Sequence, residues 1–105
     1  MTEEVSTLYA KLLGETAPIT WPELQPFFAR GVLLQVGAQL DLVEVALAVA
    51  EDDGAAVGAW MRAGALGRLE TNQAQDWQDR HPSLWAVVVA PWVLVQERAA
   101  TPSVH

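Results

Sequence analysis

The side chains best suited to chemistry are five carboxylates within a stretch of thirteen residues. They are Asp41, Glu44, Glu51, Asp52 and Asp53. Carboxylates that meet in space can bind Mg²⁺ or exchange protons. Glu44 and Glu51 are seven residues apart, a spacing that places both on one face of a helix. Four of the five, Glu44, Glu51, Asp52 and Asp53, are therefore candidate ligands of a divalent metal.

A structural interpretation of these carboxylates competes with the metal site, and we favour it. Asp41 and Glu44 have the spacing of a capping box, and Asp52 or Asp53 can cap a following helix. Glu51 is then a solvated side chain. The DDG run also lacks the alternating ligands and the terminal Glu of an EF-hand loop.

Other catalytic side chains are scarce. His81 and His105 are the two histidines; His81 precedes a proline at a predicted helix end, where the helix dipole explains it without catalysis. Ser6, Ser83 and Ser103 lie outside any GxSxG context, and the glycines form no phosphate loop. We therefore predict no catalytic residue and no cofactor, and we favour a protein that is not an enzyme.

Five tryptophans are an unusually large number for 105 residues. Tryptophan is enriched in protein cores and at interface hot spots. Trp60 and at least one of Trp85 and Trp92 occur in the most apolar segments, so we expect them in the core. Trp21 and Trp77 have more polar surroundings and would mark a binding groove if both are partly exposed. The candidates for partner binding are Trp21, Trp77 and Trp92.

The charge balance argues against nucleic acid as a partner. Six Lys and Arg residues stand against thirteen Asp and Glu, which gives a net charge of -7. Such a chain repels phosphate backbones, and its basic residues form no run. Nucleic-acid binding would need four dispersed arginines to converge on one face: Arg30, Arg62, Arg68 and Arg80.

Cysteine is absent, which excludes disulfides, thiol nucleophiles and cysteine metal sites in this chain. The N-terminal sequence MTEEVSTLYAKLL lacks the basic region and apolar run of a signal peptide. No apolar run reaches the roughly 20 residues that a membrane span needs. We therefore expect a cytoplasmic protein that does not bind membranes.

Helical signals alternate with short apolar runs along the chain. Apolar residues from Val5 to Leu13 follow helical spacing, with Gly14 placed to end that helix. Thr20 and Glu23 predict a capping box, flanked by Ile19 and Leu24 as a hydrophobic staple. The helix beginning at Trp21 should end before Gly31 and be short or bent near Gln25, because Pro26 removes a hydrogen bond.

The middle of the chain predicts a strand, two helices and a second strand. Residues 32–36 favour a strand, and Asp41 caps the apolar helix LVEVALAVA. Val57, Trp60 and Met61 form the apolar stripe of a further helix, which Gly64 ends. The sequence LGRLE then predicts a strand, and Thr71 caps a polar helix that uses Trp77 as its anchor and stops at Pro82.

Eleven of the twelve residues from Leu84 to Val95 are apolar, with Pro91 as the interruption. This run predicts either one strand bent at Ala90 and Pro91 or two strands that turn there. Both faces of such a strand are apolar and need cover. Either helices wrap both faces or a second copy of the chain supplies the cover, and we favour a homodimer.

Three blocks of the sequence carry a resemblance to a known family. They are LYAKLLGETAPITWPELQPFFARGVLLQV, LDLVEVALAVAEDD and LWAVVVAPWVLVQE. Together they resemble the small bacterial family termed domain of unknown function 2288, from Leu8 to Glu97. The resemblance implies no reaction, ligand or partner, so it transfers no functional residue to this sequence.

The order of elements is also similar to a winged-helix layout, with residues 41–51 and 53–63 as the helix-turn-helix pair. A DNA-reading winged helix places basic or amide side chains on its recognition helix, whereas this one begins with acid and carries only Arg62. We therefore expect a winged-helix-like layout that does not read DNA sequence.

Together these features predict a small single α+β domain over residues 1–97, winged-helix-like, with a short sheet that ends in a long apolar strand or hairpin. Residues 98–105 are expected to form a flexible tail. The favoured function is a non-catalytic protein-interaction or adaptor module that binds an unknown protein or itself. The alternative is a small enzyme or a metal-dependent binder that uses the acidic residues 41–53.

Overall fold

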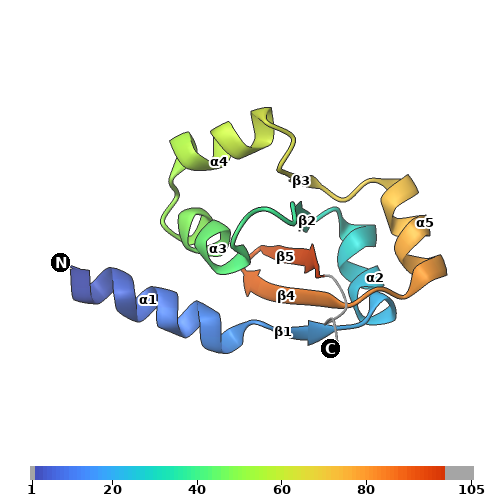
Figure 1. Ribbon diagram of the computed structural model, residues 1–105, viewed down its shortest axis with the longest axis horizontal. Helices are drawn as coiled ribbons and strands as arrows, with labels where there is room; N and C mark the ends of the chain where they lie inside the picture. Colours follow the sequence, from blue (N-terminus) through green and yellow to red (C-terminus); the bar gives the residue numbers. More distant parts are fainter. Residues whose placement is uncertain (1, 99–105) are drawn as a thin grey trace, which may run out of the picture.

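The computed structural model describes the backbone of residues 2–98 and the side chains of residues 7–98. This part of the chain forms the predicted α+β domain, with five helices and five strands (Figure 1). The helices are α1 (Thr2–Glu15), α2 (Trp21–Arg30), α3 (Leu42–Ala50), α4 (Gly54–Arg62) and α5 (Thr71–Arg80). The strands are β1 (Ala17–Ile19), β2 (Leu33–Val36), β3 (Leu66–Arg68), β4 (Leu84–Val89) and β5 (Trp92–Glu97).

The strands form one mixed sheet in the order β1-β4-β5-β2-β3. β2 and β5 pair in parallel, and the other neighbours are antiparallel. The apolar C-terminal run is two strands, because β4 and β5 form a hairpin that turns at Ala90 and Pro91. Strand β1 was not predicted; it lies at the sheet edge, where Pro18 is tolerated.

Helices of the same chain cover both faces of the sheet. One face packs against α1 and α3, with Leu42, Val45 and Leu94 in its core. The other packs against α2 and α5, around Leu24 and Trp77. Figure 1 shows α1, α3 and α4 together on one side of the molecule, and α2 and α5 on the other. A second copy is therefore not required to cover the hairpin.

Capping residues set the ends of the helices, largely as predicted. Asp41 accepts hydrogen bonds from the backbone N–H groups of Val43 and Glu44 at the start of α3. Glu23 accepts bonds from the N–H and hydroxyl of Thr20. Gly31 ends α2 with a left-handed φ of 75°, which glycine adopts readily.

Two predicted boundaries differ from the structure, and a third is confirmed. Glu70, and not Thr71, is the N-cap of α5, because Thr71 already lies in the helix. Gly14 lies inside α1, which ends one residue later at Glu15. Helix α2 is short and ends at Arg30, before Gly31, as predicted, and it continues through Pro26. The predicted bend near Gln25 stays a prediction.

One polar side chain is buried in the hairpin. Gln96 of β5 is 4% exposed, and its amide Nε2 donates to the carbonyl oxygens of Gly37 and Leu40 at 2.8 and 2.7 Å. Both acceptors belong to the segment between β2 and α3. The amide therefore fixes this segment, and with it the cap of α3, against the sheet.

The winged-helix layout is not confirmed. The α3–α4 pair exists, but the sheet has five strands with a parallel pair, and α2 and α5 add a second helical layer. Among the described residues, no helix combines the length and apolar character needed to cross a bilayer. The side chain of Val5 and residues 99–105 of the predicted tail lie outside the described part.

Candidate binding pocket beside the hairpin turn

Trp21 and Trp77, two candidates for partner binding, lie in the core. Trp21 is 5% exposed and Trp77 is fully buried. Their rings meet edge to face with centroids 6.2 Å apart, an arrangement that adds to the stability of a packed core. Neither can form an exposed groove, so this prediction is corrected. The polar sequence around Trp77 reflects the outer face of α5, while its ring points toward the sheet.

An ion-pair network fastens α5 to β5 around Trp77. The indole Nε1 of Trp77 donates to Glu97 at 3.1 Å, and the Arg80 guanidinium donates to Glu97 and Asp76. The Arg80 hydrogen bonds are the main cause that lowers the pKa of both carboxyl groups; the Trp77 bond contributes at Glu97. The network has a structural role, because it joins two elements of the core.

The other three tryptophans are only partly buried. Trp60, Trp85 and Trp92 pack at the margin of the core formed with α1 and α3. The guanidinium of Arg98 lies 4.7 Å from the ring centroid of Trp85, and that of Arg68 lies 5.6 Å from the centroid of Trp92. Stacked guanidinium groups cover part of each indole face. Trp60 and at least one of Trp85 and Trp92 were predicted in the core, and all three are only partly buried against it.

A mainly apolar pocket of about 540 Å³ opens between α3, α4 and the turn of the β4–β5 hairpin. We call it the hairpin pocket. It is lined by Leu34, Val49, Ala50, Asp52, Asp53, Gly54, Val57, Met61, Arg68, Val89, Ala90, Pro91 and Trp92. The sheet supplies Leu34, Val89 and Trp92, and α4 supplies Val57 and Met61. Its size lies in the usual range of binding pockets.

The pocket exists because α4 covers the sheet incompletely. None of the α4 residues is buried, although Val57, Trp60 and Met61 form the predicted apolar stripe. The helix is built largely of Gly and Ala, whose small side chains leave space between helix and sheet. Met61 is 46% exposed, so one wall of the pocket is an accessible and flexible thioether side chain.

The acidic candidates divide into caps and pocket residues. Asp41 caps α3 and accepts a hydrogen bond from the Tyr9 hydroxyl at 3.0 Å, which raises the pKa of Tyr9. Asp53 caps α4 by accepting from the N–H of Ala56. Asp52 and Asp53 line the pocket, whereas Glu44 and Glu51 do not. The described residues contain no group of three or more acidic or histidine side chains placed to hold a metal ion.

The remaining candidates are held at separate places. His81 is exposed and ends α5 in a left-handed conformation. Arg30 stacks on Phe27, Arg68 stacks on Trp92, and Arg80 pairs with carboxylates of α5 and β5. These contacts occupy three of the four candidate arginines individually and lend no support to a shared nucleic-acid surface.

A second, larger pocket of about 810 Å³ lies beside β3 and the start of α5. Three of its polar side chains bond to one another: the Gln35 amide donates to Gln73, and the Gln73 amide donates to Asp76. Asp76 is also occupied by Arg80. Because these groups already satisfy one another, the hairpin pocket is the stronger candidate for a binding site.

Several residues of the hairpin pocket were not singled out from the sequence. Val57 and Met61 were recognised only as a helical stripe, and Arg68 only as part of a strand and as one of four dispersed arginines. The available signal was the combination of that stripe with the Gly and Ala content of α4. Trp92 is the partner-binding candidate that the structure does place in a pocket.

The fold and its pocket define a small acidic α+β domain whose mixed sheet has helices on both faces. The chain belongs to the family described as a protein of unknown function (DUF2288), whose model matches residues 7–97. This confirms the resemblance found in the sequence.

One solved relative is the NMR solution structure of PA1075 from Pseudomonas aeruginosa, which is 63% identical to this chain. The match covers 100% of this chain and 97% of that one, with a TM-score of 0.80. No curated protein matches the chain. The function of the family is unknown, and these comparisons show no catalytic role.

Proposed function

We propose that the protein is a non-catalytic interaction module that holds an apolar side chain of a partner protein in the hairpin pocket. The observation that carries the proposal is the half-exposed Met61 at the wall of a mainly apolar pocket beside Trp92. The charged side chains that line the pocket are Asp52, Asp53 and Arg68. Asp53 is occupied as a helix cap and Arg68 stacks on a ring.

A protein partner fits the composition of this surface. Trp, Met and Arg are enriched where proteins bind one another, and binding energy concentrates in a few such side chains. A methionine wall can adjust to the shape of an inserted side chain. The pocket also opens beside an exposed hairpin turn, Ala90 and Pro91, over which a partner chain can continue.

Affinity capture of the tagged protein from its native cells, followed by mass spectrometry, tests the proposal. Met61→Lys should abolish capture of a stoichiometric partner, because it places a charge at the pocket wall. Leu13→Lys and Val88→Lys are matched controls, since those side chains are 54% and 58% exposed and do not line the pocket. Equal capture by all three variants would refute the proposal.

Two further expectations belong with this function. Self-association stays a prediction, which light scattering of the wild type and of Met61→Lys at micromolar concentration would test. A monomer in both cases would count against a homodimer. The cytoplasmic location also stays a prediction, and cell fractionation with an antibody against the chain would test it.

A further inference from the structure

We infer that the partner segment bound in the hairpin pocket carries a basic residue next to its apolar side chain. This inference rests on the proposed function and specifies the chemistry of the partner. It follows from the carboxylates of Asp52 and Asp53, which line one side of the pocket while the sheet supplies an apolar floor.

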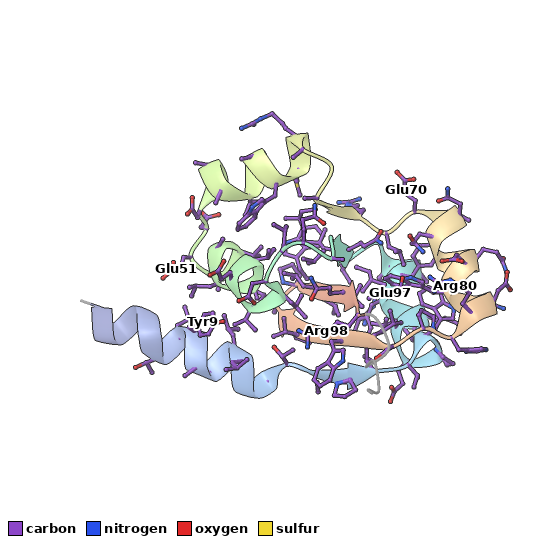
Figure 2. All side chains as sticks on the ribbon, viewed as in Figure 1. Tyr9, Glu51, Glu70, Arg80, Glu97 and Arg98 are labelled. Atoms are coloured by element: carbon purple, nitrogen blue, oxygen red, sulfur yellow. The ribbon has the colours of Figure 1, made fainter. Side chains whose placement is uncertain are left out.

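The backbone holds these carboxylates at the pocket. Asp52 has a left-handed φ of 58°, and its N–H donates to the carbonyl of Val49. The N–H of Asp53 donates to the carbonyl of Ala48 at 2.9 Å, and its side chain caps α4. The tight α3–α4 turn therefore presents both acids at the pocket. Figure 2 shows Glu51 at the same end of α3, which adds a third negative charge nearby.

No basic side chain within the described residues forms an ion pair with this acidic turn. The ion pairs within the described residues are those of Arg80 with Asp76 and Glu97, which lie on α5 and β5. Arg68, the cation that lines the pocket, lies over the ring of Trp92. Within the described residues the acidic turn therefore has no ion-pair partner, and the whole chain carries a net charge of -7.

An apolar pocket beside carboxylates that form no ion pair selects its ligands by charge. A Lys or Arg next to the inserted side chain gains an attractive interaction, whereas a neighbouring Asp or Glu is repelled. The carboxylates are exposed, so each pair contributes modestly and weakens as salt is added. Basic flanking residues should thus favour the bound segment and increase its association rate.

Titration of the ¹⁵N-labelled full chain with three short, end-blocked peptides tests the inference by NMR. The peptides contain Lys-Leu-Lys, Glu-Leu-Glu or Lys-Ser-Lys between identical Gly-Ser flanks. Only Lys-Leu-Lys should shift the Trp92 indole and the Met61 amide. The Asp52→Asn, Asp53→Ser double variant should weaken that binding about threefold to tenfold.

The variants are chosen to preserve the fold. Asn adopts left-handed backbone conformations readily, and Ser can replace Asp as a helix N-cap. Glu15→Gln is the matched control, because it removes an exposed carboxylate of α1 that does not line the pocket. It should leave peptide affinity unchanged, while raising the salt concentration should weaken Lys-Leu-Lys binding.

Three results would overturn the inference. Equal binding of Lys-Leu-Lys and Glu-Leu-Glu would remove the charge preference and leave the interaction role intact. Equal shifts from Lys-Ser-Lys would remove the need for an apolar side chain. Absence of pocket shifts with all three peptides at millimolar concentration would reject the basic-apolar segment as the ligand, and the capture experiment with Met61→Lys then decides the proposed function separately.

Discussion

Helices α5 and α4 lie over opposite faces of the sheet and differ in how completely they cover it. α5 is a polar helix, yet it closes its face because Trp77 is fully buried and bonded to Glu97. α4 is richer in apolar residues, yet it buries none of them and leaves a pocket of about 540 Å³. Both helices carry a tryptophan, but Trp60 of α4 is only partly buried, so the depth at which a side chain packs matters more than the mean polarity of the helix.

Trp77→Ala should have the largest effect on the closed face. Removing a fully buried indole leaves a cavity and should lower the free energy of unfolding by about 3–5 kcal/mol. Urea denaturation followed by circular dichroism measures the change. Trp77→Phe is the control that keeps most of the volume and should cost less. A loss below about 1 kcal/mol for the alanine variant would contradict the comparison of the two helices.

Trp92→Ala should weaken partner binding more than it lowers stability, unlike Trp77→Ala. Its ring is partly exposed and lines the pocket, so the loss of stability should stay below about 2 kcal/mol. Capture of the partner should nevertheless be abolished. The same urea series and capture assay measure both effects. A stability loss as large as that of Trp77→Ala would show that both faces are equally closed.

Asp41→Ala tests the anchoring of α3, the helix beneath α4. Loss of the N-cap should lower the free energy of unfolding by about 1 kcal/mol, while Asp41→Asn should retain most of it. Tyr9 is the one tyrosine of the chain, so its phenol can be titrated by absorbance. Its pKa should be raised in the wild type by the bond to Asp41 and return toward its ordinary value in Asp41→Ala.

The sign of the Tyr9 effect follows from that raised pKa. The contribution of Tyr9 to stability is complete below the ordinary tyrosine pKa of about 10 and is lost as the pH rises through the folded-state value. Thermal melts of the wild type between pH 9 and 11 should therefore fall more steeply than those of Asp41→Ala. Parallel melts would contradict the assignment.

Glu97→Gln should produce the smallest effect, which is a loss of stability at neutral pH that disappears in acid. The pKa of Glu97 is lowered in the folded protein, so its stabilising contribution is complete above the unfolded value of about 4.3 and is lost as the pH falls through the folded-state value. Melting temperatures of the wild type should drop more between pH 6 and pH 3 than those of Glu97→Gln. Glu15→Gln, which removes a carboxylate outside this network, should behave like the wild type.

Sequence signals of short range predicted most of the fold. The caps at Thr20 and Asp41, the helical stripe from Val57 to Met61 and the apolar run of the hairpin each depend on nearby residues. Strand β1 was not predicted because its three residues, which include Pro18, carry no strand pattern. The parallel pairing of β2 with β5 depends on contacts between residues about sixty positions apart, which no local pattern encodes.

The site was less predictable than the fold. Trp77 and Trp92 were both predicted as candidates for partner binding, yet Trp92 lines a pocket whereas Trp77 is fully buried. Their burial depends on which helix lies above them and how far its side chains reach. The pocket is likewise a gap between α4 and the sheet, and its volume follows from side-chain sizes on several separate elements.

The buried amide of Gln96 has a consequence for how the hairpin avoids mispairing. Its neighbours Val93, Leu94 and Val95 are similar in size and polarity, so apolar packing alone distinguishes poorly between β5 and a copy displaced by one residue. Such a displacement would turn the amide to the opposite face and leave the carbonyls of Gly37 and Leu40 without their donor. One polar side chain thus penalises the slipped alignments, whose exposed apolar strands would aggregate.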